Sequence, residues 1–388
     1  MSSVAPPETR VEAGAVLRAE AGHETRPETG LETPHETHSE TCHEMPPETR
    51  GQRVGVLSFA HYHANFWSEV FAGQHVLEGI WDDDRARGAE AAARFGVEYF
   101  ADLDALLGRC TAVAVCSETV EHRSLIEQAS ARGLAILCEK PLGVSVADCE
   151  QIARTVEAAG TPFMQSFPKR FDPVSHWLRD TIAHGTLGKI TMVRIRHGHF
   201  YGLQDDFKSR WYVDPAKSGG GALLDEGVHG ADLLAWLFGM PESVTAMTSN
   251  ETLSLQVEDA AVATFRYANG MLAELASSFT FAAADVSIEL YGTAGTALVS
   301  GVDLASKDIT CDRFVRVYRN DQPERAWEVI DVTPRFKIGG FHQQNAIAFL
   351  DALERNVAPP ISIDDGVRAV RMIMAAYRAA DTGQRQKV

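Results

Sequence analysis

The chain has 388 residues, 45% of them hydrophobic, and a formal net charge of −17. This length is sufficient for two domains with apolar cores. The negative charge argues against nucleic acid and anionic membranes as partners, because their phosphate groups would be repelled. We find no apolar run of about 18 residues, so no membrane span is predicted. The six cysteines form no C-x-x-C pair, which is typical of reduced thiols and predicts a cytoplasmic location.

Residues 1–50 differ in composition from the rest of the chain. A glutamate recurs at every fourth position from Glu24 to Glu48, while prolines and a glycine interrupt any long helix. Few large apolar side chains are available for burial, so we predict a disordered acidic tail. Four tail residues could suggest a metal site: His35, His38, Cys42 and His43. We favour the alternative that a repeated tetrapeptide happens to contain histidine.

From residue 51 the chain alternates short apolar strands with amphipathic helices. The predicted strands are 53–59, 74–82, the start of 97–108, 111–117, 134–140 and 162–167. The predicted helices are 63–73, 85–96, the end of 97–108, 120–133 and 145–160, the last with Ser145 as its N-cap. This alternation predicts an α/β domain with a doubly wound parallel sheet in residues 51–171, which binds ligands beyond the carboxyl ends of its strands.

The turn after the first strand departs from the G-x-G-x-x-G pattern with which dinucleotide-binding folds approach a pyrophosphate. Ser58, Ala60 and His63 stand at the three glycine positions. The first two are small enough to keep the turn, whereas His63 is a large departure. His61 and His63 could donate hydrogen bonds to phosphate, or could be ordinary half-buried histidines. Asp82 ends the second strand 24 residues after Ser58, where an acidic residue binds the ribose 2′-OH of NAD.

The motif Glu139-Lys140-Pro141 stands at the end of the strand predicted over 134–140. The carboxyl end of a parallel strand faces the ligand crevice, so Lys140 would bring an ammonium group there. A solvated surface turn would have the same sequence, because Lys and Glu usually face water.

A glycine-rich segment, "SGGGALLDEGVHGADLLAWLFG" at 218–239, predicts a flexible entry followed by an amphipathic helix. Asp225 and His229 would share one face of that helix, with Asp232 one turn further on. A histidine beside carboxylates can transfer protons near neutral pH. The same face could instead bind a metal, but no further ligand cluster is evident, so we predict no metal site.

The second half of the chain is rich in strands joined by short turns. After a helix within 170–188, the strand-like runs are 189–200, 243–249, 260–270, 271–281, 285–292, 296–301, 313–320 and 326–332. Two helices, about 341–355 and 364–382, follow. This pattern predicts an α+β domain over 172–388 with a largely antiparallel sheet. One sheet face would need cover, so we predict a homodimer or homotetramer formed through it.

Taken in order, the motifs make residues 53–388 resemble the Gfo/Idh/MocA family of oxidoreductases. Those that carry the resemblance are "IWDDD" (80–84), "VCSETVEH" (115–122), "CEKP" (138–141), "KRFDP" (169–173), the segment 218–239 and "IDDGVRAVRMIMAAYRAADTG" (363–383). The resemblance implies an NAD(P)-binding Rossmann domain over 51–171 and a substrate-binding, oligomer-forming domain over 172–388.

The resemblance also implies site residues. Lys140 matches the lysine that hydrogen-bonds the reacting hydroxyl, His229 the general acid/base, and Asp225 the carboxylate that orients the substrate. The implied cofactor is NAD rather than NADP, because of Asp82. The implied cofactor-binding residues are Ser58, Phe59, Ala60, His61, Asp82, Arg85, Ser117, Thr119, His122, Glu139 and Lys140. The implied substrate-binding residues are Arg170, Trp211, Asp225 and His229.

Oxidation of a secondary alcohol requires a base for the hydroxyl proton and a cation beside the developing alkoxide, roles that His229 and Lys140 could fill. We therefore expect hydride transfer between a nicotinamide cofactor and a sugar, cyclitol or related polyol. Two alternatives remain: a non-catalytic regulatory protein that binds a nucleotide or sugar, and a redox-assisted, NAD-dependent glycoside hydrolase.

Overall fold

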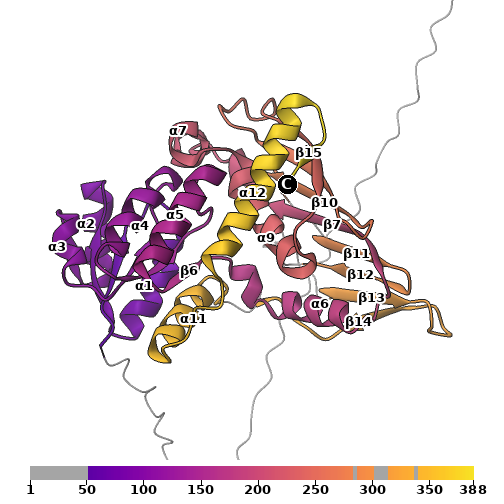
Figure 1. The fold of residues 1–388 in the computed structure, drawn as a ribbon, viewed down its shortest axis with the longest axis horizontal. Helices are drawn as coiled ribbons and strands as arrows, with labels where there is room; N and C mark the ends of the chain where they lie inside the picture. Colours follow the sequence, from indigo (N-terminus) through magenta and orange to yellow (C-terminus); the bar gives the residue numbers. More distant parts are fainter. Residues whose placement is uncertain (1–50, 283–285, 301–312, 336–339) are drawn as a thin grey trace, which may run out of the picture. The chain divides into compact units, whose positions relative to one another are not determined.

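The computed structural model describes residues 51–282, 286–300, 313–335 and 340–388. Within them it contains two sheets, each with its own set of helices (Figure 1). The predicted tail and its histidines lie outside the described residues. Among the described residues, no helix combines the length and the apolar character needed to cross a membrane.

The first sheet has six parallel strands in the order β3-β2-β1-β4-β5-β6. They are β1 (Val54–Leu57), β2 (Leu77–Trp81), β3 (Glu98–Phe100), β4 (Ala112–Val115), β5 (Ala135–Cys138) and β6 (Phe163–Gln165). The strand order reverses between β1 and β4, and ligands of doubly wound sheets bind in the crevice at this point. The predicted Rossmann fold is confirmed.

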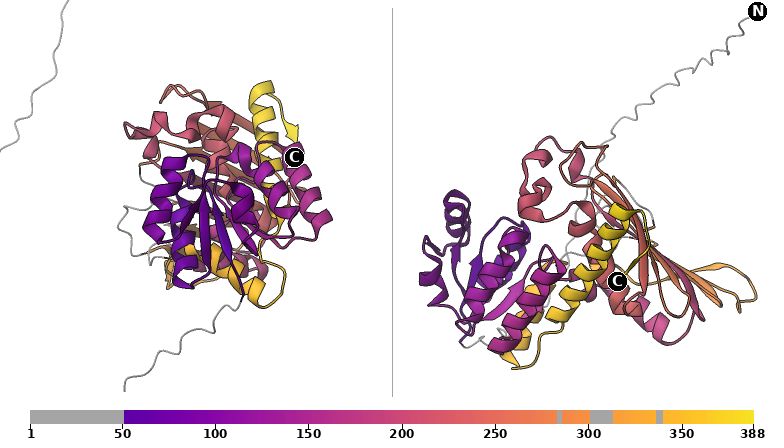
Figure 2. Two further views of the ribbon diagram at one scale, coloured as in Figure 1. Left: turned by 90° about the vertical axis from the view of Figure 1, so that its left-hand side faces the viewer. Right: turned by 45° about the horizontal axis from the view of Figure 1, so that its top comes forward.

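Helices on both faces bury this sheet, and Figure 2 shows its strands fanned between them. They are α1 (His63–Gly73), α2 (Arg85–Phe95), α3 (Leu103–Leu107), α4 (His122–Ser130) and α5 (Val146–Ala159). Because both faces are covered, β1, β4 and β5 consist entirely of buried residues. Ser145 caps α5 by accepting a hydrogen bond from the Asp148 amide, as predicted.

The second sheet has nine strands in the order β14-β13-β12-β11-β7-β10-β9-β8-β15. Only the β7–β10 pair is parallel among the described strands of this sheet, so the predicted, largely antiparallel sheet is confirmed. Its strands are β7 (Ile190–Gly198), β8 (Ser243–Ser249), β9 (Ala260–Arg266), β10 (Leu272–Ser278), β11 (Ile288–Gly292), β12 (Gly295–Val299), β13 (Val315–Arg319), β14 (Trp327–Ile330) and β15 (Gln386–Lys387).

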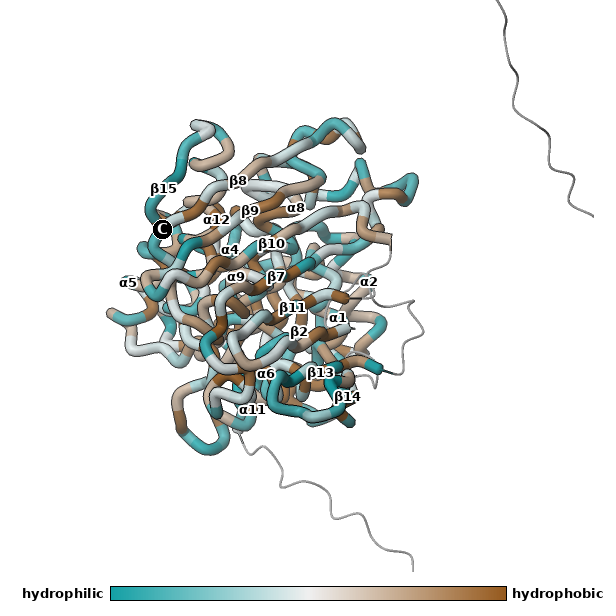
Figure 3. Tube along the Cα trace, turned by 90° about the vertical axis from the view of Figure 1, so that its right-hand side faces the viewer, coloured by the Kyte–Doolittle hydropathy of each residue, from teal (hydrophilic) through white to brown (hydrophobic). Residues whose placement is uncertain are grey.

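Helices cover one face of the second sheet, and Figure 3 views the sheet from the opposite side. The helices of this half of the chain are α6 (Pro173–Ala183), α7 (Pro215–Ser218), α8 (Ala222–Asp225), α9 (Gly227–Phe238), α11 (Gln343–Glu354) and α12 (Ile363–Thr382), of which α8, α9 and α12 pack on the sheet. The helix α9 packs on β7 and β10, and α12 packs on β8. Because α12 also contacts α5 and β6, it joins the two halves of the fold.

The glycine-rich segment departs from its predicted structure. Instead of one continuous helix, it forms α8 and α9, which are separated at Glu226. The close approach of Gly221 to the backbone of Glu258 explains the start of α8, since a Cβ on Gly221 would lie 2.1 Å from the Glu258 carbonyl oxygen. The Glu258 carboxylate accepts hydrogen bonds from the amides of Gly221 and Leu223. The reason for the break between the two helices lies in the site.

Candidate active site

One cavity of about 640 Å³ opens between the carboxyl ends of the first sheet's strands and the α8–α9 segment. Its lining combines the turn after β1, the ends of β4 and β5, the end of β7, and α8–α9. Charged and titratable side chains dominate the lining: His61, His63, Arg87, Glu118, Lys140, Lys169, His197, His199, Arg210, Lys217, Asp225, Glu226, His229 and His342. Size and chemistry suit a polar ligand of substantial size.

Lys140 and Asp225, predicted as site residues, lie in direct contact. Lys140 Nζ donates hydrogen bonds to Asp225 Oδ1 at 2.5 Å and to the Asp225 carbonyl oxygen at 3.1 Å. Burial alone would lower the pKa of Lys140, but the charges of Asp225, Glu226 and Glu139 outweigh it, so the pKa is raised and the side chain is an ammonium.

The second of these hydrogen bonds explains why α8 and α9 are separate helices. In a continuous α-helix the carbonyl of residue 225 would accept from the amide of residue 229. Here the Asp225 carbonyl accepts a hydrogen bond from Lys140 Nζ, and the His229 amide donates to the Glu226 carbonyl oxygen at 3.2 Å instead. Asp225 and His229 therefore line one cavity from two helices rather than from one helix face.

His229 is buried and lines the cavity. Burial, followed by the charges of His197 and Lys140, lowers its pKa well below the ordinary histidine value, so the imidazole is neutral near pH 7. Its Nδ1 is buried and makes no hydrogen bond to any described residue. A neutral imidazole with an available nitrogen can accept a proton, as the predicted role requires.

Beside His229 lies a group that the sequence motifs do not indicate. The ring of His197 stacks on that of His229 with centroids 4.8 Å apart. His197 Nδ1 lies 2.8 Å from Glu226 Oε2, and His199 Nε2 lies 3.7 Å from Glu226 Oε1. Burial favours the neutral acid, but the hydrogen bond from His197 and the nearby cations lower the pKa of Glu226, so it is a buried carboxylate.

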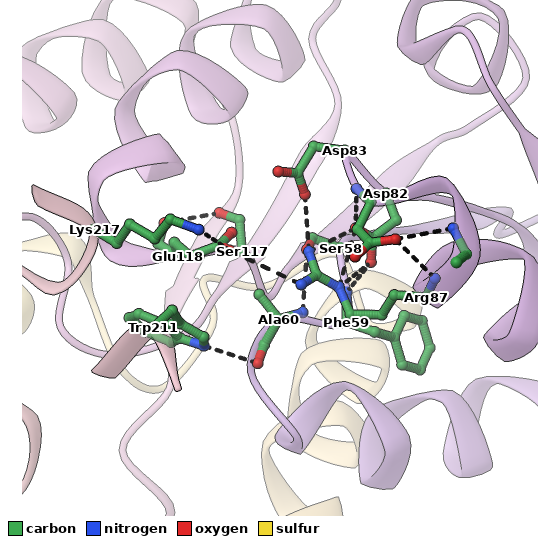
Figure 4. A network of polar contacts seen from close by, with 12 residues as sticks. Ser58, Phe59, Ala60, Asp82, Asp83, Arg87, Ser117, Glu118, Trp211 and Lys217 are labelled. Carbon is green, nitrogen blue, oxygen red and sulfur yellow. Dashed lines mark hydrogen bonds and ion pairs between the residues drawn. The ribbon is translucent and has the colours of Figure 1, made fainter. Parts of the chain in front are cut away.

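Asp82 stands at the carboxyl end of β2, as predicted, but its carboxylate is already paired (Figure 4). Arg87 binds it through Nη2 at 2.7 Å and Nε at 2.9 Å, and also reaches Ser58 Oγ at 3.2 Å. Arg87 lines the cavity, whereas the predicted Arg85 is exposed at the start of α2 and is not among the lining residues in the described part of the chain. Arg87, which the sequence analysis did not single out, is thus the arginine beside Asp82, and the cofactor-binding role of Arg85 stays a prediction.

The turn after β1 keeps the shape of a glycine fingerprint without its glycines. Ser58 adopts φ 72°, a left-handed conformation that usually requires glycine. Its Oγ accepts the amide hydrogen of Ala60 at 3.1 Å, which supports the strained residue. The Phe59 amide donates to Asp82 Oδ2 at 2.7 Å, and the His61 amide to Cys116 O at 2.9 Å.

A dinucleotide therefore fits this crevice in part. At the ribose end, Asp82 and Ser58 lie where the cofactor's hydroxyls are held, once Arg87 turns aside or pairs with a phosphate. At the turn, several amides that would contact a pyrophosphate already have partners, and the buried side chain of His63 fills the position of the third glycine.

Of the residues predicted from "VCSETVEH", Ser117 and Thr119 are buried at the end of β4. His122 has a different place from the one implied. Its Nδ1 lies 2.9 Å from Pro141 O and its Nε2 3.3 Å from Ser117 O, so it braces two turns and is not among the cavity-lining residues of the described chain. Glu118 lines the cavity instead.

Arg170, predicted to bind substrate, is buried in an ion-pair network. Its guanidinium binds Asp232 at 2.5 Å and Asp365 at 3.0 Å, which joins α9 to α12. Within the described ranges neither Arg170 nor Asp232 lines the cavity, and the substrate-binding role of Arg170 stays a prediction. Lys169, its neighbour, is the lining residue.

Trp211 does line the cavity, where it packs on the β1–α1 turn. The indole Nε1 donates to Ala60 O at 2.9 Å, and the ring stacks on Tyr212 with centroids 4.1 Å apart (Figure 4). Trp211 thus ties the second domain to the fingerprint turn.

Glu139 is fully buried and faces the histidines of the turn. His63 Nδ1 lies 3.2 Å, and His61 Nε2 3.9 Å, from Glu139 Oε1. The ring of His342, which precedes α11, lies 3.9 Å from that of His63 between centroids. The sequence gives no sign that His342 joins this group, because it lies 279 residues after His63.

The fold and the cavity define a protein with a dinucleotide-type crevice at the carboxyl ends of a parallel sheet and a second, largely antiparallel sheet. The family model described as "Oxidoreductase family, NAD-binding Rossmann fold" matches residues 53–167, and that of the GFO/IDH/MocA C-terminal domain matches residues 176–298. Together these matches span more than half of the chain. The protein belongs to the Gfo/Idh/MocA family of oxidoreductases, as the motifs predict.

Relatives of similar length match most of the chain. It is 26% identical over 307 residues to 1,5-anhydro-D-fructose reductase of Ensifer adhaerens, which covers 78% of this chain and 88% of the relative. It is 24% identical over 346 residues to D-apiose dehydrogenase of Paraburkholderia graminis, covering 86% and 88%. In fold it is similar to the WlbA dehydrogenase from Bordetella pertussis, solved with NADH and UDP-GlcNAcA, with a TM-score of 0.74, 20% identity and coverage of 88% and 99%.

Proposed function

We propose that this family member transfers hydride between a nicotinamide cofactor and a secondary alcohol or carbonyl group of a sugar, cyclitol or related polyol. The observation that carries the proposal is the contact of Lys140 with Asp225 beside neutral His229, in a cavity that extends to Arg87 at the ribose end of the crevice. Similarity to a sugar reductase and a sugar dehydrogenase supports the same class of substrate.

The three residues divide the chemistry. A bound nicotinamide would supply the hydride acceptor or donor. The ammonium of Lys140 stabilises negative charge on the substrate oxygen, and His229 takes the hydroxyl proton during oxidation or returns it during reduction. Asp225 accepts hydrogen bonds from neighbouring hydroxyls and holds the lysine in place. The His197–Glu226 pair lies behind His229 and orients the imidazole by stacking.

We propose NAD as the cofactor, with Asp82 binding the ribose hydroxyls after Arg87 is displaced. The experiment is a titration of the purified full-length protein with NADH and NADPH, followed by nicotinamide fluorescence. Saturable NADH binding that weakens in Asp82→Ala supports the proposal. Absence of binding by either nucleotide would overturn it and favour a regulatory protein that uses the same cleft. A polyol panel with NAD⁺ would then identify the substrate from NADH formation.

The uncovered face of the second sheet supports a homo-oligomer. Its exposed apolar side chains include adjacent pairs across strands, Met247 with Val262 and Met192 with Leu272. The ion-paired side chains of Arg194, Glu274 and Glu289 lie on the same face, and a mixture of exposed apolar and charged side chains suits an interface between subunits. We expect light scattering to give a dimer or tetramer, and Met247→Asp combined with Leu272→Asp to give a monomer. A wild-type monomer would contradict this assignment.

We also propose a cytoplasmic location, in line with the four described cysteines, Cys110, Cys116, Cys138 and Cys149, all of which are buried free thiols.

A further inference from the structure

Three imidazoles and one carboxylate from three distant parts of the chain meet at the inner wall of the cavity. His61 and His63 come from the β1–α1 turn, Glu139 from the end of β5, and His342 from the residue before α11. All four are at least nine-tenths buried, and Glu139 is completely so. The three histidines also line the cavity, so the group is both enclosed and reachable.

Five polar atoms of this group have no hydrogen-bond partner among the described residues. This holds for both carboxylate oxygens of Glu139, both ring nitrogens of His63, and Nδ1 of His342. Buried polar atoms are almost always paired, and an unpaired buried carboxylate is among the most costly exceptions. A group bound between these atoms would remove that cost.

The spacing of the atoms fits a metal ion. One ligand atom from each of His61, His63 and Glu139 lies within 4.8 Å of the other two. Two ligands about 2.0–2.2 Å from one ion stand roughly 3–3.5 Å apart at right or tetrahedral angles. The separations of 3.2 Å and 3.9 Å from Glu139 Oε1 require shifts of only a few tenths of an ångström.

The charge of the surroundings also permits a cation. The carboxylates of Glu139, Asp225 and Glu226 all interact electrostatically with the ammonium group of Lys140. A second ammonium group, that of Lys169, lies near the histidines. With neutral imidazoles, three carboxylates then face two ammonium groups.

We propose that His61, His63 and Glu139, with His342 as a further ligand, form a binding site for a divalent transition metal ion, for which zinc best suits the donor set. Three imidazole and carboxylate donors, His61, His63 and Glu139, leave the fourth position of a tetrahedral site for His342 or for water, as in catalytic zinc sites. Because His61, His63 and His342 line the cavity, water or a substrate oxygen could reach an ion held there. This site goes beyond the proposed hydride transfer and does not depend on it.

The test is metal binding by the full-length protein. After treatment with a chelator, the protein is titrated with Zn²⁺ against a chromophoric chelator, and the bound metal is measured by mass spectrometry. We expect one ion that is lost in His63→Ala and in Glu139→Gln. Their affinity should fall by more than about 100-fold, the upper end of what loss of a residue that merely supports a ligand costs. Substitution of Co²⁺ should give a visible absorption band that the same variants lose.

Two matched controls locate the ion. His184→Ala removes an exposed histidine on the same chain, and His199→Ala disrupts the other candidate group, His199, Asp225 and Glu226. Both should retain the ion. The proposal is overturned if wild type binds no ion, or if His63→Ala and Glu139→Gln bind it as wild type does, which would place it elsewhere, including among the tail histidines. If His63→Ala does not fold, metal binding by Glu139→Gln and His342→Gln tests the proposal instead.

NADH binding is measured on the same samples, so that failure of the metal site can be distinguished from failure of the proposed function.

Discussion

Lys140 binds Asp225 at both its carboxylate and its carbonyl oxygen, and in doing so it ends one helix and allows another to begin. A residue of the first domain thereby sets the position of His229 in the second. The contact that would serve catalysis is also the contact that shapes the backbone of the site.

The first prediction concerns this contact. Lys140→Ala should lower kcat/KM by about 100-fold or more on whichever polyol is turned over, because the charge beside the reacting oxygen is lost. Steady-state kinetics measures the effect, and Lys189→Ala, which removes an exposed lysine, is the control. A Lys140→Ala enzyme within about threefold of wild type would rule out the assigned role.

The second prediction concerns the choice of nucleotide. Arg87→Ala should lower the affinity for NADPH relative to NADH by about tenfold, the contribution of one charge-assisted hydrogen bond. The remaining Asp82 carboxylate would repel a 2′-phosphate. Fluorescence titration with both nucleotides measures the ratio. Arg85→Ala on the same helix should leave it unchanged, and the reverse pattern would restore the prediction made from the sequence.

The third prediction concerns Arg170. Its replacement by Met leaves the buried carboxylate of Asp232 without its ion-pair partner, while Asp365 keeps Arg368, so the free energy of unfolding should fall by about 3–5 kcal/mol. Urea denaturation measures the change. Arg179→Ala, which removes an exposed arginine packed on Trp236, should cost less than about 1 kcal/mol. Equal losses in the two variants would contradict the assignment.

The fourth prediction concerns pH. Burial lowers the pKa of five histidines below the unfolded value of about 6.5: His61, His63, His122, His229 and His342. The unfolded chain therefore binds more protons on acidification than the folded chain, and stability present above pH 6.5 is lost below it. Each histidine contributes up to about 1.4 kcal/mol per pH unit.

The urea concentration at the midpoint of unfolding should therefore decrease as the pH is lowered from 7.5 to 5.5. The decrease should be smaller in His229→Asn. A midpoint that is flat or rises over this interval would show that these histidines are not held neutral. Protonation of Glu139, whose pKa is raised mainly by burial, offsets part of the loss at the acidic end.

The local pattern of apolar and polar residues was sufficient to predict the two sheets, because the periodicity of a strand or helix can be recognised from consecutive residues. Lys140, Asp225 and His229 follow from motifs for the same reason. Their geometry does not, since the break between α8 and α9 depends on a hydrogen bond from residue 140. Two arginines stand two positions apart on α2, and only the phase of the helix after its cap at Asp84 brings Arg87 rather than Arg85 onto Asp82.

Contacts between side chains far apart in the chain could not be predicted from the sequence. The resemblance implied a substrate-binding role for Arg170, but its pairing with Asp365, which lies 195 residues further on, could not be predicted from the sequence. The grouping of His342 with His63 and Glu139 likewise depends on tertiary contact alone.

The contacts of α12 with the first sheet bear on how the chain folds while it is being synthesised. Gly366 of α12 lies so close to the first domain that a Cβ there would stand 2.7 Å from Gln165 Oε1 and 3.1 Å from Leu142 Cβ. The Gln165 amide donates to Ile361 O at 3.1 Å. About 200 residues separate β6 from α12, so a ribosome would need roughly 10–40 s to supply the helix.

During that interval the apolar side of α5 and β6 has no cover from α12. Nascent chains halted before Ile363 should therefore be cut by protease within residues 135–167, whereas chains that have released α12 should resist cleavage there. Equal resistance would mean that the first domain completes itself without the later half of the chain.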